Sequence, residues 1–113
     1  MKEISSITNA ELKVIADEMY GDFVKADIDV ARGILLIDME LHADGEAYLL
    51  QQGSQQADLW GINLYPEYFD SDGFIEFDSM INIRPRQNNP SRDVLDSVLR
   101  AKIIFLVREK VHA

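Results

Sequence analysis

The sequence predicts a small α+β domain in which a four-stranded, mainly antiparallel sheet carries its helices on one face. Four segments alternate apolar and polar residues, as strands do, and three others have helical spacing or helix-capping residues. The short middle helix separates the strands into two hairpins, so the predicted order is αββαββα in two layers. A chain of 113 residues has the size of one domain, which we expect to span residues 1–113.

The first predicted helix covers residues 9–20. Thr8 and Glu11 have capping-box spacing, in which threonine accepts a hydrogen bond from a free amide and glutamate reaches back to the cap. Apolar residues then follow at helical spacing, and Gly21 suits the left-handed conformation that ends many helices.

Four strands are predicted from alternation with a period of two residues, which is typical of a strand with one wet face. They cover residues 23–30, 34–41, 58–65 and 74–84. Pro66 ends the third strand and Pro85 ends the fourth, because proline cannot donate to a sheet.

Two further helices complete the prediction. A short helix over residues 45–52 has Asp44 as its cap, since an aspartate accepts hydrogen bonds from free amides at a helix start. The last helix covers residues 90–110, with Asn89 as its cap and Pro90 in the first turn, where a missing amide costs least.

Composition excludes several classes of function. The net charge of −9 comes from 20 acidic and 11 basic residues, which disfavours binding to nucleic acid. The chain has no cysteine, so disulfides, thiolate zinc sites and cysteine nucleophiles are excluded. It shows no signal peptide and no apolar run that could span a membrane. We therefore expect a cytoplasmic protein without membrane association.

The polar side chains around strand 74–84 are the first candidate site. Arg84 can form two parallel hydrogen bonds to a carboxylate or phosphate, and the amides that open the last helix point toward the same end of the strand. The predicted ligand-binding residues are Asn63, Asp78, Asn82, Arg84 and Asn88. In the alternative interpretation, Arg84 pairs with an acidic neighbour such as Asp78 or Glu40, and Asn88 merely forms a turn.

A second candidate is a metal site made by His42, Asp44 and Glu46. In an extended segment all three side chains would share one face and supply nitrogen and oxygen ligands to a divalent metal ion. A helix starting near Asp44 would instead turn that residue away. Asp44 would then cap the helix, and the negative charge of Glu46 would interact favourably with the helix dipole at its N-terminus. His42 would be a hydrogen-bonded residue at the end of the preceding strand.

No nucleophile and base pair stands out in the sequence, so whether the protein is an enzyme stays open. Self-association is a third interpretation. Exposed apolar residues on the open face of the sheet could form its interface, and these are Leu36, Leu59, Tyr65 and Met80.

Three blocks of sequence stand out together: HADGE at residues 42–46, LWGINLYP at 59–66 and FDSMINIRP at 77–85. With these blocks the chain resembles a family of short uncharacterised bacterial and archaeal proteins that form a domain of unknown function. The resemblance extends from the first strand to the last helix. It implies a single-domain cytoplasmic protein of a prokaryote, and it implies no activity, substrate or cofactor.

We therefore expect a small binding domain that recognises an anionic small ligand or a protein partner. The predicted binding surface is the open face of the sheet together with the junction between strand 74–84 and the last helix. The alternative is a metal-dependent hydrolase or nuclease-like enzyme that uses His42, Asp44 and Glu46.

Overall fold

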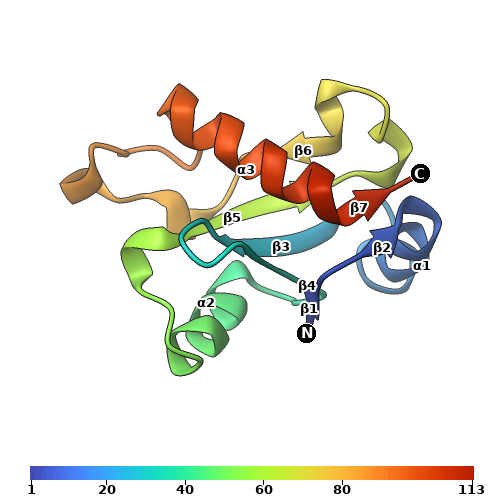
Figure 1. Ribbon diagram of the computed structural model, residues 1–113, viewed down its shortest axis with the longest axis horizontal. Coiled ribbons are helices and arrows are strands. Elements are labelled where there is room, and N and C mark those ends of the chain that lie inside the picture. Colours follow the sequence, from blue (N-terminus) through green and yellow to red (C-terminus); the bar gives the residue numbers. More distant parts are fainter.

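The computed structural model describes residues 1–113 and confirms an α+β fold with a mainly antiparallel sheet (Figure 1). The five-stranded sheet has the order β1-β4-β3-β5-β6, and a separate parallel pair joins β2 to β7. The strands are β1 (Lys2–Ile4), β2 (Ile7–Thr8), β3 (Val24–Asp29), β4 (Ile34–Ile37), β5 (Leu59–Leu64), β6 (Ile75–Glu76) and β7 (Val111–His112). The helices are α1 (Asn9–Met19), α2 (His42–Gln51) and α3 (Ser97–Lys110).

The prediction of four strands is wrong because the N-terminal segment adds a fifth. β1 pairs with β4 along the edge opposite β6. It is only three residues long, which is too short for an alternating pattern to be recognised in the sequence.

The prediction that all helices cover one face of the sheet is also wrong. α1 and α3 pack on one face, where Leu12 and Ile103 join the main hydrophobic core. α2 packs on the other face through Leu49, which contacts Leu36 and Leu59 of the sheet. The sheet therefore lies between two helical layers (Figure 1), and the surface predicted to be open is largely covered.

The start of α1 is as predicted. The Thr8 side chain accepts a hydrogen bond from the Glu11 amide at 3.1 Å, and the Glu11 carboxylate accepts one from the Thr8 amide at 3.3 Å. This is the complete capping box.

The second strand and the second helix were predicted with wrong boundaries. β4 ends at Ile37, because Asp38 has a positive φ of 70° that turns the chain out of the sheet. α2 then begins at His42, before the predicted helix at 45–52, and no side chain caps it. Asp44 consequently lies within the first turn of α2 and not at the cap.

The predicted strand at 74–84 is wrong beyond Glu76. Ser79 accepts a hydrogen bond from the amide of Ile81 and opens a 3₁₀ turn at Met80–Asn82, so this alternating pattern belongs to irregular chain. α3 likewise begins at Ser97 and not at residue 90, because Asp96 is its cap. No helix of the structure is long and apolar enough to cross a membrane.

A polar cavity at the start of α2

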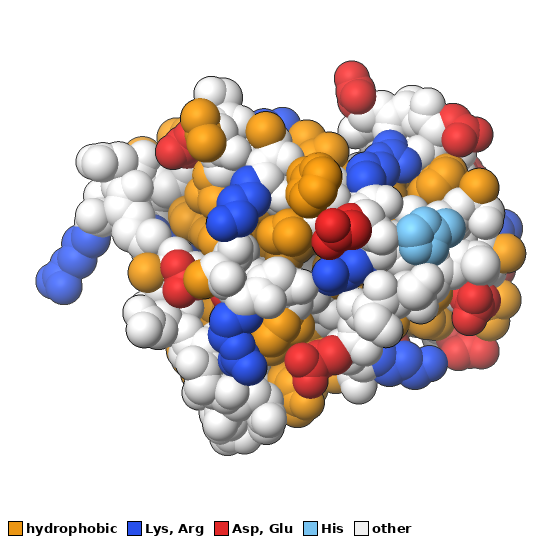
Figure 2. All heavy atoms as spheres, in the orientation of Figure 1, with side chains coloured by type: hydrophobic (Ala, Val, Ile, Leu, Met, Phe, Trp, Pro, Cys, Tyr) orange, Lys and Arg blue, Asp and Glu red, His pale blue; other side chains and the backbone are white.

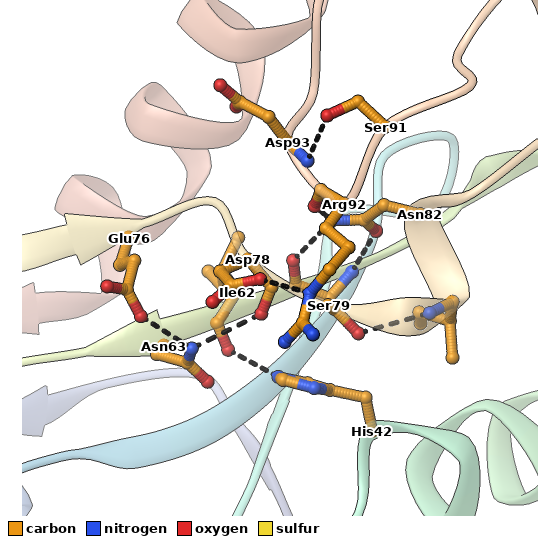
Figure 3. Close-up of polar contacts among 12 residues, drawn as sticks. His42, Ile62, Asn63, Glu76, Asp78, Ser79, Asn82, Ser91, Arg92 and Asp93 are labelled. Carbon is orange, nitrogen blue, oxygen red and sulfur yellow. Dashed lines mark hydrogen bonds and ion pairs between the residues drawn. The ribbon is translucent and has the colours of Figure 1, made fainter.

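A cavity of about 550 Å³ lies where the first residues of α2 approach β5, β6 and the chain that follows β6. It combines aromatic and polar side chains with the ends of several elements. The polar and aromatic lining residues are Phe23, Lys25, His42, Asn63, Tyr65, Glu76, Asp78, Ser79 and Arg92. Figure 3 shows Asn63 on β5 with Glu76 and Asp78 beside it, and His42 pointing from the start of α2 toward Ile62.

The carboxylate of Glu76 is held at the cavity by neutral hydrogen-bond donors. Glu76 and Asn63 are cross-strand partners of β6 and β5, so their side chains emerge side by side. Asn63 Nδ2 donates to Glu76 Oε1 at 2.8 Å, and the Tyr65 hydroxyl donates to the same oxygen at 3.2 Å. No basic side chain forms an ion pair with Glu76, so its charge is not neutralised within the protein.

His42 is buried at the other side of the cavity and carries no positive charge at neutral pH. Its Nε2 lies 2.8 Å from the carbonyl oxygen of Ile62, and a carbonyl only accepts, so Nε2 holds the ring proton. Burial lowers the pKa of His42, although its hydrogen bond to Ile62 opposes the shift. Nδ1 of the neutral ring is consequently an acceptor with no hydrogen-bond partner in the protein.

Gly61 makes room for the cavity wall. A Cβ atom at Gly61 would lie 2.6 Å from the Ser79 hydroxyl oxygen and 3.0 Å from Cδ2 of His42. Only a residue without a side chain lets His42 and Ser79 approach β5 this closely.

A second acceptor at the cavity is also unused. The amide oxygen of Asn63 is buried and accepts no hydrogen bond, while its nitrogen donates to Glu76 and to the carbonyl of Asp78. The side-chain amide of Asn63 lies close to the imidazole of His42 and contributes to raising its pKa. The two groups do not form a well-aligned hydrogen bond. Leaving a buried acceptor unpaired in this way costs stability.

Each of the two basic side chains at the cavity donates a hydrogen bond to an acceptor of the protein. Arg92 Nε donates to Asp78 Oδ1 at 2.6 Å, and both side chains are about half exposed at the rim. Lys25 donates to the carbonyl of Glu40 at 3.0 Å and lies over the ring of Tyr20 at 5.0 Å. The pKa of Tyr65 is raised first by burial and then by the negative charge of Glu76.

Aromatic rings form one edge of the cavity. Tyr20 stacks on Phe23 with ring centres 4.9 Å apart, and Phe23 stacks on Tyr65 at 5.3 Å. Phe23 and Tyr65 line the cavity, so they give it an apolar edge beside the carboxylate of Glu76.

Of the five predicted ligand-binding residues, the structure brings only Asn63 and Asp78 to the cavity. Asn82 is fully buried and uses its amide group to bond both the N–H and the C=O of Gly61, at 2.8 and 2.9 Å. Asn88 has a φ of 59° and ends the turn at Pro85–Gln87. Asn82 therefore fixes the chain beside β5, whereas Asn88 forms a turn outside the cavity.

Arg84 lies in a separate buried cluster. Its guanidinium is 4.5 Å from the ring centre of Trp60 and donates to the carbonyls of Ile81, Gln56 and Leu59. The acidic neighbour of Arg84 is Glu46, at 3.6 Å, and not Asp78 or Glu40. The backbone amides that were expected to bind an anion beside Arg84 do not lie there, because α3 begins only at Ser97.

Asp27 belongs to the same cluster and was missed as a special residue. It is fully buried between β3 and α2, and neither carboxylate oxygen has a hydrogen-bond partner. Burial raises its pKa to about 9, Glu46 adds to the shift and Arg84 opposes it. Gly45 provides the space, because a Cβ there would overlap the Asp27 carboxyl group. A glycine inside a predicted helix was the only signal in the sequence.

The structure does not bring the three predicted metal ligands together. His42 faces the cavity, Glu46 pairs with Arg84, and Asp44 lines a different hollow beside Tyr48. No group of three or more histidine, aspartate or glutamate side chains could hold a metal ion. The physical reason is that α2 begins at His42, so the three residues follow a helix and Asp44 turns away from the other two.

The cavity residues outside the prediction are chiefly Glu76, Tyr65 and Arg92. Alternation placed Glu76 and Tyr65 on the same face as Asn63, and the predicted hairpin made the two strands neighbours. The sequence did not give the register that pairs Asn63 with Glu76. Arg92 reaches Asp78 across 14 positions of irregular chain, for which the sequence gives no signal.

Comparison with known proteins supports the family-level resemblance. No curated protein and no solved structure matches the chain. A family model described as "Protein of unknown function (DUF5674)" matches residues 3–110, which is nearly the whole chain. The chain therefore belongs to this family of proteins of unknown function.

Proposed function

We propose that the protein is a binding domain whose cavity at the start of α2 takes a small organic ligand with a positively charged amino group. The observation that carries this proposal is the carboxylate of Glu76, which faces the cavity, is held by Asn63 and Tyr65 and has no basic partner. A primary ammonium group supplies three donors and a positive charge, so it complements this carboxylate.

The remaining free groups favour the same chemistry. His42 Nδ1 accepts no hydrogen bond within the protein and can accept one from a donor-rich ligand. The rings of Phe23 and Tyr65 supply an apolar wall against which the carbon chain of such a ligand can pack. An anionic ligand, as expected from the sequence, would have to share Arg92 with Asp78 and would lie near the carboxylate of Glu76, which has no basic partner.

Calorimetric titration with putrescine, a diamine, and with succinate, a dicarboxylate of the same chain length, tests the proposal. The protein is expected to bind putrescine and not succinate. Glu76→Gln keeps the shape of the side chain, removes its charge and is expected to weaken binding about 10-fold or more. Glu18→Gln makes the same change on the exposed surface of α1 and is the matched control. Binding of succinate in preference to putrescine, or equal putrescine binding by both variants, would reject the proposal.

A further inference from the structure

The charged side chains that line the cavity at the start of α2 are balanced in sign. Two are acidic, Glu76 and Asp78, and two are basic, Lys25 and Arg92. The pKa of His42 is lowered by burial, so its neutral ring leaves this balance unchanged. The lining therefore has no net charge in a chain whose net charge is −9. A ligand that carries charges of both signs complements such a lining.

The face of the molecule that carries α3 shows no comparable group. Figure 2 shows acidic and basic side chains scattered among hydrophobic ones over the region where Figure 1 places α3. In the cavity, by contrast, an unpaired carboxylate and unused basic donors line the same space, as the contacts of Glu76 and Arg92 show.

Arg92 keeps unused donors at the rim of the cavity. Of its guanidinium nitrogens only Nε donates within the protein, to Asp78 Oδ1 at 2.6 Å. Nη1 and Nη2 both carry N–H donors, and neither has a hydrogen-bond partner. Lys25 Nζ likewise donates to a single acceptor, the carbonyl of Glu40, and has further hydrogens. Both basic groups can therefore donate to a carboxylate while they keep their present partners.

The unpaired carboxylate and the unused guanidinium donors lie at different places in the cavity. Figure 3 shows Asp78 between Glu76 and Arg92. Asp78 follows Glu76 by two positions, and side chains with this spacing on an extended chain lie about 6–7 Å apart. A ligand that reaches both Glu76 and Arg92 therefore needs several bonds between its positive and its negative group.

We propose that the ligand of this cavity is an ω-amino acid, a molecule with an ammonium group at one end of a carbon chain and a carboxylate at the other. The inference rests on the proposed amine site and adds Arg92 as a second recognition group. The ammonium group binds Glu76, and the carboxylate accepts hydrogen bonds from Nη1 and Nη2 of Arg92. The ammonium end neutralises the charge of Glu76, which a simple anion would leave unpaired.

Calorimetric titration with n-butylamine and 4-aminobutanoate tests the role of Arg92, because the two molecules differ at the end remote from the amine. The wild-type protein is expected to bind 4-aminobutanoate about 10-fold more tightly. Arg92→Gln should abolish this preference. It also leaves Asp78 without its cation, so the affinity for butylamine should not fall. Arg86→Gln changes an exposed arginine outside the cavity lining and should leave both affinities unchanged.

The distance between the two charges is tested with 2-aminobutanoate, an isomer of 4-aminobutanoate whose charged groups share one carbon atom. It should bind about 10-fold more weakly than 4-aminobutanoate, since it cannot reach Glu76 and Arg92 together. The ion pair of Arg92 with Asp78 is about half exposed and contributes little to stability, so Arg92→Gln should stay folded.

A measurement without substitution follows the Arg92 Nε–H signal by two-dimensional NMR. This signal should shift on addition of 4-aminobutanoate and not on addition of butylamine. Equal binding of 4-aminobutanoate and butylamine, equal binding of the two isomers, or an unchanged preference in Arg92→Gln would overturn the ω-amino acid and leave the amine site standing. Binding of neither amine would reject the amine site and this inference with it.

Discussion

Asn63 donates a hydrogen bond of 2.8 Å to Glu76 across the pairing of β5 with β6. This contact orients the only carboxylate of the cavity that lacks a basic partner. It also fixes the amide of Asn63 so that its oxygen is left without a donor. One cross-strand pair thus fixes the position of the carboxylate on which the proposed ligand depends.

Asp27 should make the protein less stable as the pH rises. Its pKa is about 9 in the folded state against 3.8 for an ordinary aspartate, so between these pH values the folded protein keeps a proton that the unfolded chain has lost. The free energy of unfolding therefore falls with increasing pH over this range. Asp27→Asn imitates the protonated carboxyl group, and we expect it to raise Tm at pH 8 by about 5 °C or more and by less at pH 5.

Thermal unfolding at both pH values, followed by circular dichroism, measures the effect. Asp17→Asn on the exposed surface of α1 is the control, and it should show no such dependence. A loss of stability in Asp27→Asn at pH 8 would mean that Asp27 is charged in the folded protein.

Gly61→Ala should damage the wall of the cavity. The new methyl group would lie 2.6 Å from Ser79 and 3.0 Å from His42, so one of them must move. We expect a loss of about 1–3 kcal/mol in the free energy of unfolding, as for other overpacked cores. Gly73→Ala is the control, since the nearest atom would be 3.4 Å away. Urea unfolding compares the two, and equal stability would contradict the close packing at Gly61.

Arg84 should support the fold without taking part in ligand binding. Arg84→Ala leaves Glu46 buried without its positive partner and removes several hydrogen bonds to carbonyls, so it should cost about 3–5 kcal/mol. Arg86→Ala removes an exposed arginine two positions away and should change stability little. Where Arg84→Ala remains folded, its affinity for putrescine should equal that of the wild type. A selective loss of that affinity would place Arg84 in the site.

Local signals in the sequence predicted local structure well. The capping box of Thr8 and Glu11 located the start of α1, and alternation located β3 and β5 to within one residue at each end. The same alternation was misleading after Glu76, where buried polar groups such as Asn82 take the place of strand pairing. Alternation with a period of two residues also occurs in a loop whose side chains form hydrogen bonds to the backbone of a distant segment, so it cannot distinguish such a loop from a strand.

The site was harder to predict because its contacts join segments that are far apart in the sequence. Asn63 and Asp78 do meet in one cavity, but Arg84 looked like a ligand-binding residue only because its partners were unknown. Those partners include the carbonyls of Gln56 and Leu59, and an arginine gives no sign of which carbonyls will occupy it. The burial of Asp27 was equally hidden, since it depends on α2 covering the second face of the sheet.

The side-chain amide of Asn63 offers the most direct test of the central claim, which is that the cavity binds an amine. Titration of the ¹⁵N-labelled protein with putrescine, followed by two-dimensional NMR, should shift the Asn63 side-chain signals together with the backbone signals of His42 and Glu76. The side-chain amide of Gln55, an exposed residue outside the lining of this cavity, should stay in place. Unchanged Asn63, His42 and Glu76 signals at saturating putrescine would contradict the claim.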